Sequence, residues 1–408
     1  MRIAILESII MPAGHEVEFD RILVDELQRQ GHEPVLWVSE DFPFKLDYGV
    51  PVDYLAGGQV VTYAGAPKWK KPFLALLREK RRRAWFQDAY RKILAGGYDA
   101  LIIPTATYRY IKAILGTDLK NSPIPVHIIF HGIGKAEREK FYQQAEKIRA
   151  YSNIYLDVIT LRKDIEREDL PQVRTLVPPV YVPHVQTEEV VHDCLGPSSL
   201  DSNLDTEKRP IRLGFFGQYR QEKNLAVFLE AFIQAHFKVP VTLVVQGATT
   251  TPGDAAAFEE LIQRYKKYEN IEFLHKNLIG DDWDRALLSV DALLLPYGAE
   301  RYRYHWSAML FTAIGFHKRV LISPEINPEV LEAYAIGQTI DLSSVRTIGR
   351  DMESFVASLA DHPGAYEKAL KEANDRYGHA AFIDHLLRPA QAHRKAVRSA
   401  LQRLALES

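Results

Sequence analysis

The chain has 408 residues, and 51 Lys and Arg against 53 Asp and Glu leave a formal net charge of -2. That length predicts about two domains, and the balanced charge excludes a chain that is basic throughout, as general nucleic-acid binders are. The single cysteine, Cys194, excludes an internal disulfide and thiolate metal clusters, which favours a reducing cytoplasm.

The first part of the chain alternates strand-like and helical runs. The opening "MRIAILESII" is interrupted by Glu7 and lacks a cleavage site, so it predicts a strand rather than a signal peptide. A helix over 18–30 and the strands "PVLWV", "ALIIPT", "VHIIFHG" and "DVITL" follow. Apolar strands separated by helices are typical of a doubly wound parallel sheet. We therefore expect an α/β, Rossmann-like domain over residues 1–190.

Within this domain, residues 68–83 read "KWKKPFLALLREKRRR", with eight basic side chains against Glu79 and with apolar residues between them. Such a segment predicts contact with an anionic membrane surface, where each basic residue contributes about 1 kcal/mol. The alternatives are a solvated amphipathic helix and a pocket for an acidic acceptor. The apolar runs elsewhere are far shorter than the roughly 20 residues that cross a bilayer.

A second set of alternating elements follows a polar, turn-rich stretch. We interpret residues 191–210 as a linker and expect a second doubly wound domain over 211–378, built on "IRLGFFG", "VTLVVQG", "IEFLH", "ALLLPY", "VLISP" and "QTIDL". Two such domains would face each other across a cleft. The tail, residues 379–408, reads as a helix that is broken at Pro389 and can cross back to the first domain.

The stretch "FFGQYRQEKNLAVFLEAF", residues 215–232, combines a strand end, a glycine and a helix start. Gly217 permits close backbone approach, and Arg220 and Lys223 carry positive charge to the start of a helix that Asn224 can cap. The stretch therefore predicts a site for a pyrophosphate. The alternative is a tight turn with solvated charges.

A second stretch of the same domain, residues 293–323, leaves a strand at Pro296 and reaches Ser307, a good N-cap for the helix "AMLFTAIGF". The start of that helix offers free N–H groups to a phosphate. If both stretches open on the same side of the sheet, a diphosphate fits between them. An ordinary capped core helix is the alternative.

The first of these stretches resembles the donor-site signature of retaining GT-B glycosyltransferases of group 1, family four. Gly217 and Lys223 match the signature, whereas Gln218 stands where the family has Arg, and Arg220 is the nearest substitute for its charge. "VHIIFHG" is similar to the strand that ends in the family's active-site histidine, here His131. The first strand, loop and helix are also similar, which implies that Gly14, His15 and Glu16 border the acceptor.

The second stretch departs from the family. Glu300 stands where the first of two glutamates is expected, but Ala308 occupies the place of the second. A better alignment with a variant form of the motif places Ser307 at the phosphate and Thr312 at the ribose. Tyr297, directly after the strand, is the remaining expected donor contact. Without the resemblance, we would interpret His131 as a surface histidine at a turn and residues 14–16 as the entry to a helix.

The resemblance implies an enzyme that moves a sugar from a nucleotide diphosphate donor, of UDP or GDP type, to a hydroxyl acceptor. His131, Lys223 and Glu300 would be catalytic, no metal or other cofactor would be needed, and the anomeric configuration would be retained. The acceptor would be a glycan, a lipid-linked sugar or a small molecule, as in polysaccharide biosynthesis at a membrane. A non-catalytic binder of sugar nucleotides or glycans and a sugar-nucleotide epimerase are the alternatives.

Other cofactor motifs are poorly represented. No Gly-x-Gly-x-x-Gly follows a strand, which disfavours dinucleotide chemistry, and no His-Glu-x-x-His is present. One Asp-x-Asp occurs, at Asp282 and Asp284, the pattern with which the other major glycosyltransferase fold holds its metal. Because it opens a helical run, we interpret it as the acidic first turn of a helix.

Overall fold

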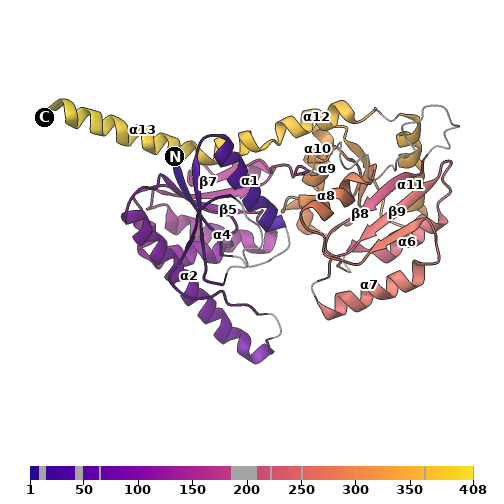
Figure 1. Ribbon diagram of the computed structural model, residues 1–408, viewed down its shortest axis with the longest axis horizontal. Coiled ribbons are helices and arrows are strands. Elements are labelled where there is room, and N and C mark those ends of the chain that lie inside the picture. Colours follow the sequence, from indigo (N-terminus) through magenta and orange to yellow (C-terminus); the bar gives the residue numbers. More distant parts are fainter. Residues whose placement is uncertain are drawn as a thin grey trace. The chain divides into compact units, whose positions relative to one another are not determined.

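The computed structural model describes residues 1–8, 15–41, 49–63, 66–184, 209–220, 223–249, 251–298, 300–362 and 364–407, with the backbone alone at 15, 16, 300 and 404–407. The chain divides into two compact units (Figure 1). The first unit consists of Met1–Pro178 and His379–Ser408, and the second of Pro179–Gly378. The segment from 379 onward therefore groups with the first unit.

Among the described residues of the first unit, seven parallel strands form one sheet in the order β3-β2-β1-β4-β5-β6-β7. They are β1 (Arg2–Leu6), β2 (Glu33–Val38), β3 (Val52–Tyr54), β4 (Ala100–Ile103), β5 (Val126–Phe130), β6 (Ile154–Ile159) and β7 (Val173–Leu176). Every residue of β4 and β5 is buried. The predicted doubly wound sheet is confirmed, because strands this apolar must be covered on both faces.

Helices cover both faces of this sheet (Figure 1). They are α1 (His15–Arg29), α2 (Lys71–Leu94), α3 (Tyr108–Leu115), α4 (Lys135–Ile148) and α13 (His379–Glu407), with short 3-10 turns at Lys68–Lys70, Asp118–Asn121 and Lys163–Ile165. Side chains of α2, α3 and α4 share one core cluster with alternate residues of the strands. On α1 and α13, Phe19 and Phe382 meet edge to face with ring centroids 5.7 Å apart.

The predicted break at Pro389 is wrong, because α13 continues through it. A proline lacks the N–H that would bond to the carbonyl four residues earlier, here that of His385. Arg174 of β7 supplies the missing donor: its guanidinium bonds to His385 O at 3.3 Å and to Leu386 O at 3.1 Å. The same guanidinium pairs with the buried carboxylate of Asp157. The proline is thus tolerated where a neighbouring strand satisfies the helix backbone.

Six parallel strands of the described residues form the sheet of the second unit, in the order β10-β9-β8-β11-β12-β13. They are β8 (Ile211–Phe215), β9 (Val241–Gln246), β10 (Ile271–Leu274), β11 (Ala292–Leu295), β12 (Arg319–Ile322) and β13 (Gly337–Thr339). β9 and β10 lie to one side of β8, and β11 to β13 lie to the other. The second predicted doubly wound sheet is therefore also confirmed.

The helices of this unit are α6 (Leu225–Gln234), α7 (Pro252–Tyr265), α8 (Asp281–Leu288), α9 (Ala308–Gly315), α10 (Pro328–Ala333), α11 (Val345–Asp361) and α12 (Glu367–Arg376), with a 3-10 turn at Glu300–Arg303. None of the described helices of either unit is long and apolar enough to cross a membrane.

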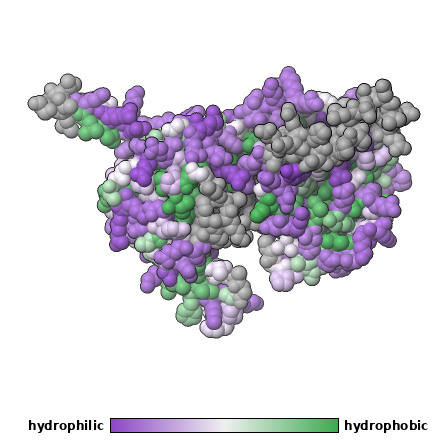
Figure 2. All heavy atoms as spheres, viewed as in Figure 1, coloured by the Kyte–Doolittle hydropathy of each residue, from purple (hydrophilic) through white to green (hydrophobic). Residues whose placement is uncertain are grey.

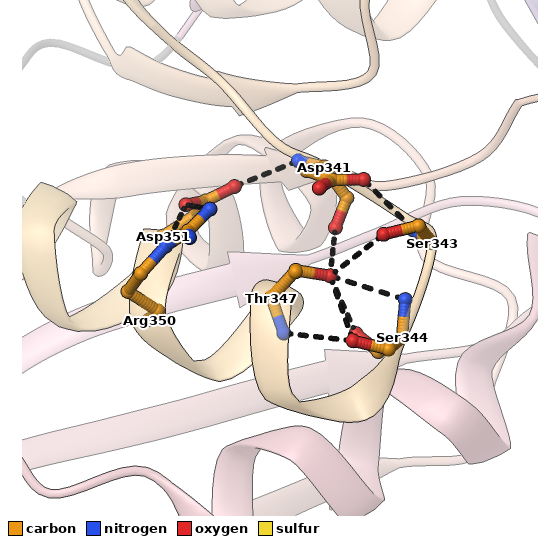
Figure 3. Close-up of polar contacts among 6 residues, drawn as sticks. All are labelled: Asp341, Ser343, Ser344, Thr347, Arg350 and Asp351. Atoms are coloured by element: carbon orange, nitrogen blue, oxygen red, sulfur yellow. Dashed lines mark hydrogen bonds and ion pairs between the residues drawn. The ribbon is translucent and has the colours of Figure 1, made fainter.

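A dense set of polar contacts lies at the start of α11 (Figure 3). The Ser344 hydroxyl accepts a hydrogen bond from Thr347 N, and the Thr347 hydroxyl accepts one from Ser344 N, both at 3.1 Å. Asp341 N donates to the Asp351 carboxylate at 2.8 Å, one helical turn further along. This reciprocal cap satisfies backbone donors that a helix start leaves without partners. These polar side chains therefore fix the turn between β13 and α11.

The second unit begins earlier than the expected boundary at residue 190. Residues Pro179–His184, here called the entry segment, belong to it. Tyr181 N donates to Phe311 O of α9 at 3.4 Å, and the carbonyl oxygen of Tyr181 approaches Gly315 so closely that a Cβ there would lie 1.9 Å away. These contacts tie the entry segment to α9. Most of the expected linker, 191–210, lies outside the described residues.

Candidate functional site

The predicted donor residues of the second unit gather where its strand order changes direction. β8 and β11 are neighbours in the sheet, and the chain leaves them toward opposite sides. At such a point the loops after the two carboxyl ends diverge and leave a crevice in which α/β proteins bind ligands. Gly217 follows β8, and Tyr297 follows β11. The site is built from these two loops.

The loop after β8 is held in place by buried polar contacts. Gly217 has φ of 110°, a conformation that other residues avoid, and its N–H donates to Gln246 Oε1 at 2.8 Å. Gln246 is 1% exposed, and its Nε2 donates to Lys276 O at 2.6 Å. Ala248 N donates to Gly217 O at 3.2 Å. One buried amide at the end of β9 thus joins the loops that follow β8 and β10.

Arg220 contacts Gln218, which stands where the family that this sequence resembles has an arginine. Arg220 Nη2 donates to Gln218 Oε1 at 2.9 Å. The positive charge therefore lies beside Gln218, although it comes from two residues further along the chain.

Lys223 lies next to Gly217 and is almost shielded from solvent. The residue is 6% exposed, and its Nζ lies 4.9 Å from the ring centroid of Tyr297 and 5.8 Å from that of Phe215. A Cβ at Gly217 would stand 3.4 Å from the same nitrogen. Aromatic faces attract a cation at these distances. The ammonium is thus placed beside the glycine turn and against two rings.

Asn224 occupies the N-cap position of α6 but does not cap it as expected. Its φ is 52°, in the left-handed region, and its side chain makes no capping hydrogen bond. A capping side chain needs extended backbone to reach back to the N–H groups of the first turn. The left-handed turn instead lets the chain pass from Lys223 directly into the helix.

Tyr297 belongs to the loop after β11, lies against Lys223 of the other loop and is 2% exposed. Burial raises the pKa of its hydroxyl, and the neighbouring Tyr302, with ring centroids 4.8 Å apart, adds to the rise. A hydrogen-bond contribution from Ser307 and the charge of Arg301 act in the opposite direction on this pKa. Tyr297 therefore stays neutral and presents its ring to Lys223.

Ser307 caps α9 as the sequence predicts. Its hydroxyl accepts from Leu310 N at 3.4 Å, and its own N–H donates to Asn327 Oδ1 at 2.8 Å. The first turn of α9 adjoins the glycine loop, because the side chain of Met309 would lie 3.9 Å from a Cβ at Gly217. The structure thus brings the start of α9, Gly217 and Lys223 together.

Two other predicted donor residues lie in α9, beyond the second loop. Ala308 is the first residue of α9, and Thr312 is buried one turn later at 4% exposure. Glu300 lies in the 3-10 turn before α9, and its side chain is outside the described part of the chain.

On the first unit, His131 follows β5 at the carboxyl edge of the sheet. Its Nε2 lies 3.0 Å from Pro104 O and 3.3 Å from Thr105 Oγ1, both after the neighbouring strand β4. Because a carbonyl only accepts, Nε2 carries the proton in that contact. The ring packs edge to face with Phe19, with centroids 4.7 Å apart. A surface histidine at a turn would not have these contacts.

The predicted acceptor-side residues are only partly described. Gly14 lies outside the described residues, and His15 and Glu16 begin α1 with their side chains outside them.

Two buried polar residues of the site were not predicted. Gln246 holds Gly217, and Asn327 holds Ser307. Asn327 itself has φ of 40° and starts α10. The available signal was a polar residue ending an otherwise apolar strand in "VTLVVQ", and an Asn before Pro in "EINPEV".

Asp282 and Asp284 open α8, where their charge suits the helix dipole. Asp284 is 3% exposed, and its carboxylate accepts from His184 N of the entry segment at 2.6 Å. Asp282 lies 3.9 Å from Lys276. Within the described ranges, no group of three or more His, Cys, Asp or Glu side chains is arranged to hold a metal ion.

The chain is similar to known proteins in structure, but no similarity in sequence was found. No family model and no curated protein matches the chain. Among solved structures, sucrose-phosphate synthase from Thermosynechococcus elongatus aligns over 100% of both chains with a TM-score of 0.61 and 12% identity. HepE from Anabaena in complex with UDP aligns over 98% of this chain and 100% of its own, with a TM-score of 0.58 and 12% identity.

A third similar structure is WaaG, a glycosyltransferase involved in lipopolysaccharide biosynthesis. It aligns over 96% of this chain and 98% of its own, with a TM-score of 0.58 and 14% identity. Together with the two parallel sheets, these likenesses show that the chain has the GT-B fold of glycosyltransferases. The expected fold class is confirmed. At these identities the comparison extends to the fold and no further.

Proposed function

We propose that this protein is a glycosyltransferase that moves a sugar from a nucleoside diphosphate donor to a hydroxyl acceptor. The observation that supports this most is the convergence of Lys223 Nζ, the Gly217 turn and the first turn of α9 at the switch point of the second sheet. A cation, an open backbone and a helix N-terminus are three features that each favour a phosphate.

The donor diphosphate would lie between the two loops. Lys223 would bind its oxygens from one side, and the N–H groups at the start of α9 would bind them from the other. Arg220, held beside Gln218, would add charge at the edge of the site. The HepE structure compared above contains UDP. A uridine nucleotide should therefore be tested first and a guanosine nucleotide second.

The chemical step breaks the bond between the anomeric carbon and the diphosphate and forms a bond from that carbon to the acceptor oxygen. The departing diphosphate gains negative charge, which Lys223 and the α9 start would stabilise. Losing one such preorganised donor typically slows catalysis by about 10²- to 10³-fold. No metal would be required, because these groups already supply positive charge. The acceptor proton would pass to the leaving phosphate, with retention of configuration.

His131 and Glu300 complete the proposed catalytic set. Following the resemblance, His131 would hydrogen-bond to the donor sugar and Glu300 would lie near that sugar. The acceptor would be a glycan, a lipid-linked sugar or a small molecule bound beside His15 and Glu16 of α1.

A second candidate is a protein that binds sugar nucleotides without transferring the sugar. It is favoured by Gln218 and Ala308, the two positions that depart from the family signature. An epimerase of the same fold is distinguished by its product, since it would convert the donor without an acceptor.

The test is an assay with UDP- and GDP-hexoses that follows release of the nucleoside diphosphate and identifies products by mass spectrometry, with and without EDTA. We expect turnover in both conditions and a loss of about 10²- to 10³-fold in Lys223→Ala. Lys238→Ala is the matched control, because Lys238 is exposed in the same unit. Binding without turnover would support the second candidate, and equal turnover of both variants would contradict the role of Lys223.

A further inference from the structure

An exposed apolar surface lies at the start of α2 in the first unit. We call residues 68–80 the α2 tip; it comprises the 3-10 turn Lys68–Lys70 and the first turns of α2. In Figure 1 this end of α2 projects beyond the body of its unit, and Figure 2 shows apolar surface in the same place. Its large exposed side chains are Trp69 (66%), Phe73 (69%), Leu76 (72%) and Leu77 (40%).

These four side chains follow a helical spacing that places them on one face. They recur at intervals of three and four residues, the pattern of an amphipathic helix that buries its apolar side. In α2, however, the buried residues begin at Arg82 and continue with Trp85 and Phe86. The tip thus extends α2 beyond the part of the helix that packs on the core of its own unit. Contiguous exposed apolar surface of this kind marks a binding surface.

The charges around the tip are positive and accessible. Lys68, Lys70, Lys71 and Lys80 are exposed, and none of them forms an ion pair within the described part of the chain. The one acidic residue of the tip, Glu79, is already paired with arginines of the same helix.

The arginines that follow the tip serve the fold instead. Arg81 donates to Gly57 O at 2.6 Å, and Arg82 is buried over the ring of Tyr110. The basic run of the sequence therefore contains lysines that face solvent, together with Arg81 and Arg82, which contact other parts of the unit.

We propose that the α2 tip binds the surface of a bilayer that contains anionic phospholipid. Trp69 and Phe73 would enter the boundary between headgroups and acyl chains, where aromatic side chains are favoured. The lysines would remain among the phosphates, each strengthening binding about fivefold. An anionic bilayer fits this chemistry better than a protein partner does, because lysine is depleted in protein interfaces. The proposal is independent of the activity proposed above.

The test is flotation of the full-length protein with phosphatidylcholine vesicles, with and without phosphatidylglycerol. We expect binding only to vesicles that contain phosphatidylglycerol. Binding should be weaker at about 1 M salt, where charges are screened within about 3 Å. Replacing Trp69, Phe73 and Leu76 by Ser should abolish flotation. Replacing the four tip lysines by Gln should weaken it by about a hundredfold or more.

A matched control removes the same number of charges elsewhere. Lys238, Lys267, Lys371 and Lys395 are exposed elsewhere in the chain, and their replacement by Gln should leave flotation unchanged. Melting curves check that each variant folds. Flotation that is equal for neutral and anionic vesicles, or unchanged in the tip variants, would overturn the proposal. A dimer that forms in solution and is lost on replacing Trp69 and Phe73, without vesicle binding, would also overturn it and assign the surface to a second copy.

Discussion

Lys223 is almost fully buried, and its ammonium lies against two aromatic rings. Its Nζ lies 4.9 Å from the ring centroid of Tyr297. Ring faces attract a cation at such distances. The rings thus place the ammonium beside Gly217, where the proposed phosphate would bind. Tyr297 is a positioning residue in this account, and its ring matters more than its hydroxyl.

Replacing Tyr297 separates these two contributions. Tyr297→Phe keeps the ring, so we expect nucleoside diphosphate binding within about twofold of the wild type. Tyr297→Leu removes a cation–π contact of about 0.5–2 kcal/mol, so binding should weaken by roughly two- to thirtyfold. Calorimetric titration measures both, with thermal melting as the control for folding. Equal affinities of the Phe and Leu variants would show that the ring does not position the lysine.

The sequence predicted some of these residues and missed others for identifiable reasons. Ser307 was predicted because a serine before an apolar helical run has few other roles. Asn224 was predicted as a cap and makes no capping bond, because its left-handed backbone depends on the turn around it. Gln246 was missed, since only the folded sheet shows that the amide spans two loops.

At the scale of elements, α13 shows how a distant strand supports a helix that contains a proline. Arg174 of β7 bonds to the two carbonyls beside the interruption and to the buried Asp157, which in turn pairs with His127 at 3.0 Å. Such a network can be recognised only when the strand and the helix are seen together. The sequence therefore predicted the helix but placed a break at Pro389.

The docking of α13 should weaken in acid. Burial lowers the pKa of half-buried His385, and the positive charges of Arg388 and Arg174 lower it further, while Asp157 and Glu166 oppose them. The unfolded chain then binds a proton more readily than the folded one, so this contribution to stability is present above the ordinary pKa of 6.5 and is lost as the pH falls below it.

Urea unfolding above and below that pH measures this effect. We expect the wild type to lose more stability on acidification than His385→Gln, which cannot titrate. If the two proteins lose stability in parallel, His385 does not contribute to the pH dependence.

In the first unit, strand prediction succeeded where burial is complete and failed at the two edge strands, β3 and β7. β4 is apolar throughout and β5 is apolar apart from His127, and both are fully buried, as is typical of interior parallel strands. β3 has three residues that are partly or fully exposed, and β7 contains Arg174 and Thr175. Neither carries an apolar run, so neither was distinguishable from a loop.

At the scale of the whole molecule, the chain passes between its two units twice. The crossings are at Pro178–Pro179 and at Gly378–His379. Inside the second unit, Val180 N donates to Tyr377 O at 3.0 Å, so the two connections lie side by side. Two sets of alternating strands predicted two domains, but the boundary was placed too late because the contacts of the entry segment with α9 are distant in sequence.

Gly315 tests how tightly the entry segment holds α9. A Cβ at this position would lie 1.9 Å from Tyr181 O, so Gly315→Ala must displace backbone and should cost about 1–3 kcal/mol in the free energy of unfolding. Gly253→Ala in α7 is the control, since nothing lies closer than 3.9 Å there, and it should be neutral or slightly stabilising. Denaturant unfolding compares them, and similar values for both would contradict a tight contact.

The central claim is that the switch point of the second sheet binds a nucleoside diphosphate through Lys223. Calorimetric titration with UDP, GDP and ADP, with and without EDTA, on the wild type, Lys223→Ala and Lys238→Ala tests it directly. We predict that one nucleotide binds regardless of EDTA, that Lys223→Ala weakens it roughly tenfold to a hundredfold, and that Lys238→Ala leaves it unchanged. Absence of binding by all three nucleotides, or equal affinity in Lys223→Ala, would contradict the account.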